Sequence, residues 1–203
     1  EEFKKGLNLG YKHFVILADD TGGYGRDIGE SLPHLLDEIT RIKGNYSIEL
    51  RDVHPVWIAK YVDELERILK RRKISMIFSG TQSGNERVLK LMNRYSDVDV
   101  VEQTFLRLKN ASPEMVWGTE CIVGFPTENR NEFIDSLKFI STVNFDFGFL
   151  HPFSCKHGTE AEGIEPKIPQ REIEDRLVFS RRYLKRKGFR IYYGFKPALT
   201  FWR

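Results

Sequence analysis

The feature that most constrains this chain is a regular alternation between short apolar runs and longer runs with helical spacing. The apolar runs have the length of strands, and they lie at 13–18, 46–53, 74–78, 115–125, 145–150 and 189–195. Helical patterns lie between and after them, at 31–43, 56–73, 85–94, 98–110, 131–143 and 170–187. Such alternation predicts an α/β fold with a parallel sheet and right-handed crossovers. A doubly wound sheet and a (β/α) barrel, whole or partial, both satisfy the pattern.

The composition is that of a globular protein and excludes several other classes. Hydrophobic residues make up 40% of the 203 residues and charged residues 30%, which is incompatible with a disordered chain. No apolar run approaches the roughly 18–20 residues that cross a bilayer, so we expect no membrane partner. Two cysteines provide no disulfide framework, which predicts a reducing, cytoplasmic setting. No linker divides the chain, and we expect one domain over 1–203.

The first ten residues have the pattern of the last turns of a helix. Gly10 stands where a left-handed residue would end it. A chain that begins inside a helix is typical of a trimmed fragment, so we expect this sequence to start within the first helix of its fold.

Unusual polar and glycine-rich segments follow five of the predicted strands. They occupy 19–21, 52–55, 81–83, 124–126 and 151–153, whereas the amino ends of the strands carry nothing comparable. The carboxyl ends of parallel strands meet at one edge of a sheet or one rim of a barrel, where ligands bind. The pattern therefore predicts a site built from these loops.

Several residues in these loops have both a structural and a functional interpretation. Asp19 and Asp20 suit ribose hydroxyls, an ammonium group or a metal, but also an Asx-turn. His54 and His151 each precede a proline and lack an acidic partner at ligand spacing, so a structural role is favoured over zinc.

The two cysteines are expected to differ in reactivity. Cys121 lies inside an apolar run and is expected to be an inert buried thiol. Cys155 stands in a loop beside Lys156 and His157, which could lower its pKa, but no base is fixed by the sequence. No catalytic residue and no metal ligand is assigned.

Four stretches together resemble one family, the radical S-adenosylmethionine methylthiotransferases. The segment 82–94, Gln-Ser-Gly-x-x-Arg-Val-Leu-Lys-Leu-Met-Asn-Arg, is similar to the family pattern at its fourth strand. The segment 122–128 resembles the fifth-strand signature, and 152–154 with Gly158-Thr159 resembles the end of the sixth strand. Residues 24–27 match the second-strand loop, and order and spacing agree from residue 1 to about 187.

The resemblance implies a partial (β/α)₆ TIM-like barrel that lacks its first strand. It implies two cofactors, S-adenosylmethionine and a [4Fe–4S] cluster, a reductant protein for the cluster, and a tRNA or ribosomal-protein substrate. By resemblance, Asp19 and Asp20 lie near the methionine or ribose end of the cofactor, and Gln82 and Ser83 lie near the ribose. The turn beside the adenine is Gly124, Phe125 and Pro126. The sixth-strand segment that completes the site is Pro152 and Phe153.

The sequence departs from the family pattern at several places. The family's C-x-x-x-C-x-x-C cluster motif is not in this chain, and Cys121 and Cys155 do not replace three thiolates. The family usually has Gln at the position of Asp19 and prolines at those of Cys155 and His157. No RNA-binding β-barrel is recognisable after the last predicted helix. We therefore expect the isolated chain to be inactive without the cluster-binding segment.

Two other functions fit the same residues. One is a different radical S-adenosylmethionine reaction on the same barrel, since a fold does not fix a function. The other is a non-catalytic nucleotide-binding or RNA-binding module without a cluster. Residues 171–203 form a basic helix and strand extension, with ten Lys or Arg against three acids. Such a run is either a solvated outer helix or an RNA-docking segment.

Overall fold

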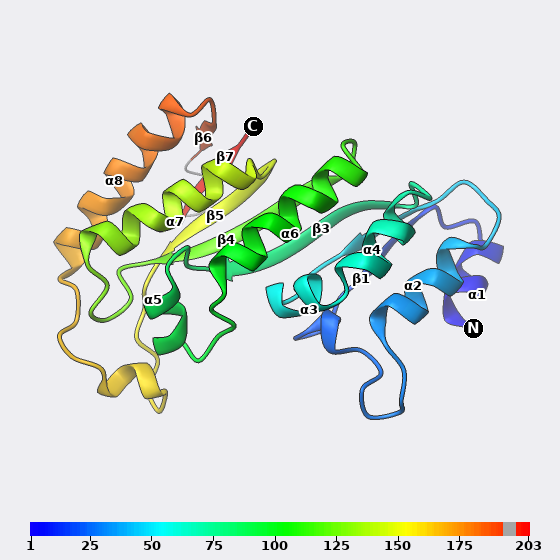
Figure 1. Cartoon of the computed structure of the whole chain (residues 1–203), viewed down its shortest axis with the longest axis horizontal. Coiled ribbons are helices and arrows are strands. Elements are labelled where there is room, and N and C mark those ends of the chain that lie inside the picture. Colours follow the sequence, from blue (N-terminus) through cyan, green and yellow to red (C-terminus); the bar gives the residue numbers. More distant parts are fainter. Residues whose placement is uncertain (193–197) are drawn as a thin grey trace. The chain divides into compact units, whose positions relative to one another are not determined.

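The structure is a computed structural model that describes residues 1–192 and 198–203 and contains two compact units. The first unit comprises Glu1–Gly80 and Gln103–Trp117, and the second comprises Thr81–Glu102 and Gly118–Arg203. Strands and helices alternate along most of the chain (Figure 1), as the sequence predicts.

Three parallel strands form the sheet of the first unit. β1 (His13–Ile16) pairs with β2 (Ser47–Leu50), and β2 pairs with β3 (Ile74–Gln82), whose last two residues belong to the second unit. The helices of this unit are α1 (Glu2–Asn8), α2 (Leu32–Thr40), α3 (Pro55–Lys60), α4 (Val62–Leu69) and most of α6 (Val98–Ala111), with a 3₁₀ turn, η1 (Thr21–Gly23). The first helix ends before Gly10, whose φ is +88°, as expected.

Local sequence explains where two of these helices begin. Ser31 caps α2, because its Oγ accepts from the His34 backbone N–H at 3.3 Å. The single helix predicted over 56–73 is wrong: two helices, α3 and α4, meet at Tyr61, whose φ of −106° and ψ of 23° are not helical. The apolar spacing continues across this break, so the pattern alone did not show it.

The continuous apolar run at 13–18 is typical of a buried parallel strand, but the first strand is not buried on both faces. Val15 and Leu17 are 58% and 64% exposed, although the run at 13–18 is apolar. Burial alternates along β1, so the face with His13 and Val15 is exposed and the face with Phe14 and Ile16 is half-buried.

The second unit contains a mixed sheet. Most of β4 (Val116–Val123) belongs to it and runs parallel to β5 (Phe147–Pro152). β5 pairs antiparallel with β7 (Leu199–Trp202), which pairs antiparallel with β6 (Arg190–Tyr192). The helices of this unit are α5 (Glu86–Leu91), α7 (Arg130–Val143) and α8 (Gln170–Arg186), with a second 3₁₀ turn, η2 (Glu160–Gly163).

The carboxyl end of the sheet differs from the prediction. The strand expected over 189–195 covers only Arg190–Tyr192, and the predicted positions 193–195 lie outside the described residues. β7 was not predicted, and it makes this end antiparallel rather than parallel. Its four residues are too short a run to indicate a strand without the partner that β5 supplies.

Side-chain caps fix the helices of the second unit. Asn85 caps α5, because its Oδ1 accepts from the backbone N–H groups of Arg87 and Val88. Asn129 and Glu132 form a reciprocal capping box at the start of α7. α7 and α8 lie side by side (Figure 1). None of the helices in the described part of the chain has the length and apolar character needed to cross a bilayer.

Candidate cofactor site

A polar cluster joins the carboxyl-terminal parts of three strands in the second unit. Glu120 of β4 accepts from the Gln82 side-chain amide at 2.8 Å, and its other carboxylate oxygen lies 3.3 Å from Nε2 of His151. Glu120 pairs with Phe149 across the sheet, so His151, two residues on, is its diagonal neighbour on the same face. We call Gln82, Glu120 and His151 the polar cluster.

The charge of Glu120 is stabilised by the rest of the cluster. The hydrogen bond with His151 and that with Gln82 hold the pKa of the Glu120 carboxyl below its ordinary value, against the effect of burial. The carboxylate is therefore ionised at neutral pH. The Gln82 amide N–H₂ is occupied by Glu120, which leaves the Gln82 carbonyl oxygen as an acceptor. The side chains of Glu120 and His151 are 30% and 42% exposed, so a ligand with O–H or N–H donors can reach the cluster.

The turn after β3 places Gln82 and holds Ser83 apart from it. Gln82 has a φ of +64°, a left-handed conformation that non-glycine residues rarely adopt. Ser83 is 2% exposed, and its hydroxyl accepts from the Asn85 N–H at 3.2 Å and lies 3.3 Å from the Ser136 hydroxyl. Gly84 donates to Ser136 at 2.9 Å, and a Cβ on it would lie within 2.8 Å of that residue. Ser83 thus stabilises the turn against α7.

The loops after β4 and β5 meet through two aromatic rings. Phe125 and Phe153 pack edge to face with ring centroids 5.3 Å apart, and Phe153 donates its N–H to Val123 at 2.8 Å. Gly124 has a φ of +83°, and a Cβ on it would lie 2.5 Å from Ile173 of α8. Pro126 is buried beside Phe125, whereas Pro152 and Phe153 are half-buried. Five of the predicted site residues are therefore brought together at this point.

Two arginine–glutamate pairs fix the segment that follows. Arg176 of α8 donates to Glu128 at 2.7 Å, and Glu128 also accepts from the Gly124 N–H at 2.8 Å. Arg87 of α5 donates to both oxygens of Glu132 and to the backbone carbonyl of Thr127 at 2.9 Å. These bidentate and buried contacts hold the loop after β4 in one conformation.

The two predicted aspartates lie in the first unit. Asp20 accepts from Nε1 of Trp57 at 2.6 Å, while Asp19 is exposed. Trp57 stacks on Tyr61, with 5.8 Å between centroids and 15° between planes, and the guanidinium of Arg26 lies 5.1 Å from its ring centroid. The Asp20 carboxylate thus orients an indole within its own unit.

The described residues do not match the donor set of a [4Fe–4S] cluster. Such a cluster takes cysteine thiolates. Both cysteines are free thiols, and burial raises the pKa of Cys121 to about 12, whereas Cys155 is exposed. No group of three or more His, Cys, Asp or Glu side chains that could hold a metal is found in residues 1–192 and 198–203. His54 caps α3 through its Nδ1, at 3.4 Å from the Val56 N–H.

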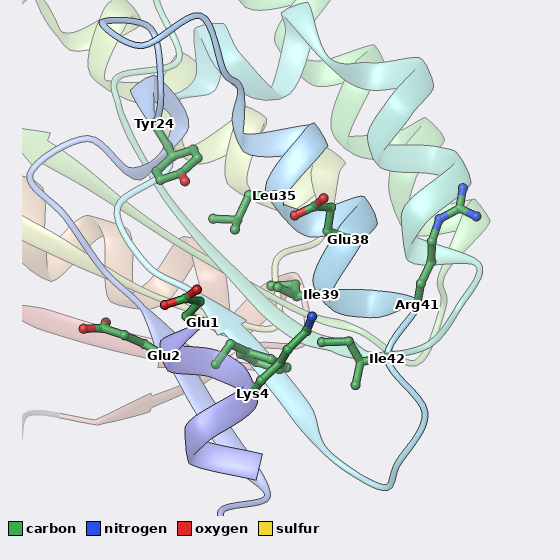
Figure 2. A pocket seen from close by; sticks show the side chains of 10 residues that line it. Glu1, Glu2, Lys4, Tyr24, Leu35, Glu38, Ile39, Arg41 and Ile42 are labelled. Atoms are coloured by element: carbon green, nitrogen blue, oxygen red, sulfur yellow. The ribbon is translucent and has the colours of Figure 1, made fainter. Parts of the chain in front are cut away.

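A pocket of about 590 Å³ opens in the first unit between α1 and α2 (Figure 2). Glu1, Lys4, Tyr24 and Arg41 are among its lining residues, and none of the predicted site residues is. It is not the site that the strand ends predict.

Sequence reasoning missed two members of the polar cluster. Glu120 was a detectable signal, because it is the one charged residue within the apolar run at 117–125. His151 was considered only as a metal ligand, and its contact with Glu120 depends on the register of β4 and β5, which the sequence does not display.

The chain belongs to the radical SAM superfamily, whose family model matches residues 1–140. Solved structures have a similar fold. Escherichia coli coproporphyrinogen III oxidase, a radical SAM enzyme, superposes with a TM-score of 0.65 at 20% identity, over 85% of this chain and 38% of that one. A TYW1 structure with a lysine–pyruvate adduct has a TM-score of 0.54 at 9% identity, over 100% and 60%. The partial-barrel class predicted from the sequence is confirmed.

Curated relatives at about 30% identity are tRNA methylthiotransferases. A probable threonylcarbamoyladenosine tRNA methylthiotransferase of Methanocaldococcus jannaschii is 32% identical over 92% of this chain and 45% of that protein. The tRNA-2-methylthio-N(6)-dimethylallyladenosine synthase of Protochlamydia amoebophila is 33% identical over 87% and 40%. Threonylcarbamoyladenosine tRNA methylthiotransferase MtaB of Thermotoga maritima is 31% identical over 87% and 41%. The chain thus spans less than half the length of these relatives.

Proposed function

We propose that this chain is the nucleoside-binding part of a radical SAM methylthiotransferase that acts on tRNA in the cytoplasm. The similarity to tRNA methylthiotransferases over about nine-tenths of the chain supports the reaction class and favours tRNA over a ribosomal protein. The observations that carry the proposal are the polar cluster, on β3, β4 and β5, and the Phe125–Phe153 pair, which follows β4 and β5; their chemistry suits a ribose and a purine.

The donor set fits S-adenosylmethionine in its nucleoside half. The Gln82 carbonyl and the ionised Glu120 carboxylate are acceptors for ribose hydroxyls, and His151 holds that carboxylate in place. Phe153 offers a half-buried ring for the adenine, supported from behind by Phe125. Ser83 acts indirectly in this proposal, by fixing the turn that carries Gln82.

The cofactor itself supplies the reactive group, so the residues of this chain bind and orient it. The cluster that such chemistry requires finds no cysteine set among the described residues, and no step is assigned to it here. A reductant protein would be a partner of the [4Fe–4S] cluster rather than of the side chains of Gln82, Glu120 and His151. The two aspartates, Asp19 and Asp20, remain candidates for the methionine end.

Two measurements on the complete protein test the proposal. Calorimetry compares S-adenosylmethionine binding by the parent, Glu120→Gln and a control, Glu174→Gln, whose carboxylate is exposed on α8. Loss of a hydrogen bond to a charged group should weaken binding about tenfold or more in Glu120→Gln and leave the control unchanged. Equal affinities in all three would exclude this ribose site.

The reaction is tested separately with tRNA. The anaerobically reconstituted complete protein is incubated with S-adenosylmethionine, a reductant, sulfide and unmodified or precursor-modified tRNA. Mass spectrometry of the digested nucleosides should detect a methylthioadenosine. Cleavage of S-adenosylmethionine without any methylthio product on tRNA would instead favour another radical SAM reaction, which the coproporphyrinogen oxidase-like fold also permits.

A further inference from the structure

The last part of the chain carries a concentrated positive charge. Residues 176–203 contain no Asp or Glu, but they contain nine Lys or Arg at 176, 181, 182, 185, 186, 187, 190, 196 and 203. The formal net charge of the whole chain is only +3, so the remaining residues are net negative. The positive charge is therefore local.

The structure separates the buried and the basic sides of α8. Ile173, Arg176, Ser180 and Leu184 recur at spacings of three and four and are buried. Arg181, Arg182, Lys185 and Arg186 lie in the carboxyl-terminal half of α8, and all four are exposed. We call these four residues the basic face.

Several exposed basic residues on or next to other helices have acidic partners nearby. Arg41 pairs with Asp37, Lys70 with Glu66, and Lys90 with Glu86, each four residues apart. In contrast, Arg182, Lys185 and Arg186 of the basic face have no ion-pair partner among the described residues. Three of the four positive charges on this face are thus not part of a network of surface ion pairs.

Stabilisation of the helix explains only part of this charge. Cations near the carboxyl end interact favourably with the helix dipole, but this effect is confined to the last turn. Lys185 and Arg186 lie in the last turn of α8, whereas Arg181 and Arg182 precede it. A dipole effect therefore does not account for two of the four cations.

An aromatic ring lies on α8 among these basic residues. Tyr183, the residue after Arg182, is half-buried, and Lys187 lies 5.9 Å from its ring centroid. Cations beside accessible aromatic rings are the combination that binds phosphates and stacks unpaired bases.

We propose that the basic face docks the tRNA substrate through its phosphate backbone. This inference rests on the proposed tRNA methylthiotransferase function and adds the surface that receives the RNA. Charge complementarity selects a polyanion as the occupant. Because phosphate contacts carry no sequence information, this surface would position tRNAs generally, and the choice of nucleotide would lie elsewhere.

Fluorescence anisotropy with a labelled, unmodified tRNA transcript tests the surface, on the complete protein over 50–200 mM salt. Three variants are compared with the parent: Arg181→Glu/Arg182→Glu/Lys185→Glu/Arg186→Glu, the same four positions changed to Gln, and a control. The control reverses Lys4, Lys5, Lys12 and Lys43 to Glu, four exposed lysines of the first unit that undergo the same change in charge.

Each lost phosphate contact removes about 0.7–0.9 from the slope of log affinity against log salt. Both α8 variants should therefore have slopes shallower by about 3 and should bind at least tenfold more weakly at low salt. The Gln variant removes the charges without disfavouring the helix, because Gln is a good helix former. Circular dichroism verifies that the variants fold. The control should keep most of the parent's slope.

Equal slopes in the parent and a folded Gln variant would overturn the proposal, and so would an equal loss in the control. A parent that binds a ribosomal protein but not tRNA would also overturn it. S-adenosylmethionine affinity is measured on the same variants. If α8 variants bind it normally and still modify tRNA with an unchanged KM, the docking surface fails while the proposed function stands. If tRNA binding depends on α8 but no methylthio product forms, the docking surface stands while the proposed function fails.

Discussion

Arg176 and Glu128 form an ion pair at 2.7 Å in which both side chains are almost completely buried, at 2% and 0% exposed. Arg176 also donates to the Glu128 backbone carbonyl at 2.9 Å, and the Gly124 N–H donates to the carboxylate at 2.8 Å. The second carboxylate oxygen of Glu128 has no hydrogen-bond partner among the described residues. The pair joins α8 to the loop after β4, so the geometry of that loop depends on a buried charge.

The stability of the protein should therefore depend on pH through Glu128. Burial raises the pKa of Glu128 from 4.5 to about 7, against the lowering effects of Gly124 and Arg176. Because the folded pKa is the higher one, the stabilising contribution is complete below pH 4.5 and is lost as the pH rises to 7. A difference of this size corresponds to about 3 kcal/mol.

Urea denaturation of the parent and Glu128→Gln from pH 4.5 to 7.5 measures this effect. The difference in unfolding free energy between the two proteins isolates the contribution of the Glu128 carboxyl. The parent should lose about 3 kcal/mol relative to the variant over this range. Arg176→Gln provides the complementary test, since it leaves Glu128 buried without its partner and should destabilise the fold by about 3–5 kcal/mol at pH 7.5. A pH-independent difference between parent and Glu128→Gln would contradict the raised pKa.

A second prediction concerns Gly124. An alanine there combines a φ of +83° with a Cβ only 2.5 Å from Ile173. Overpacking costs about 1–3 kcal/mol and left-handed strain about 1–2. Gly124→Ala should therefore destabilise the protein by about 3 kcal/mol. Gly158→Ala is the matched control, because Gly158 has a φ of +79° and open space around it.

Chemical denaturation of both variants in the parent and in an Ile173→Ala background separates the two causes. In the Ile173→Ala background, Gly124→Ala should cost only about 1–2 kcal/mol, as Gly158→Ala does in the parent. An unchanged cost in that background would show that Ile173 is not what excludes a side chain from this turn.

Much of the scaffold could be predicted from the sequence because local rules fix it. Asn85 ends a polar turn before an amphipathic run, and the capping contacts that this implies are present. The apolar runs mark six of the seven strands found in the described residues, though with different ends. β7 was missed because it forms a strand only by pairing with β5. The break between two helices at Tyr61 was missed because the helical spacing of apolar residues continues across it.

The site could be predicted only as a set of loops. The partner of Glu120 is set by the register of β4 against β5, and Arg176 meets Glu128 across 48 positions of sequence. Ser83 also shows that a position after a strand does not establish a ligand-binding role. Its hydroxyl accepts a hydrogen bond from the backbone N–H of Asn85 in the same turn. Such contacts arise from tertiary packing, which residue types and spacing do not specify.

A third prediction concerns the titration of Glu120. Its lowered pKa has the His151 hydrogen bond as the largest lowering cause and the Gln82 hydrogen bond as the next. His151→Ala should therefore raise the pKa of the Glu120 carboxyl toward its ordinary value, and Gln82→Ala should raise it less. Carbon-13 NMR of labelled glutamate side chains measures both shifts, with the exposed Glu174 as an internal reference.

The sign of the matching stability change also follows. Because the folded pKa of Glu120 is the lower one, its contribution is present above the ordinary pKa and is lost as the pH falls through the folded value. His151→Ala should accordingly reduce acid-dependent unfolding. If its titration curve for Glu120 coincides with that of the parent, the two side chains are not coupled in solution.

The last prediction concerns the thiols of residues 1–203. Cys121 is fully buried within β4, and its pKa of about 12 leaves about one thiolate in ten thousand at pH 8, whereas Cys155 is exposed. A disulfide reagent should therefore modify one thiol per folded chain at pH 8, none in Cys155→Ser, and two in urea. With a single accessible thiol, this chain should also fail to assemble a cluster from iron and sulfide, because a [4Fe–4S] cluster requires several cysteine ligands. About four irons per chain with a stable thiolate absorption would refute this.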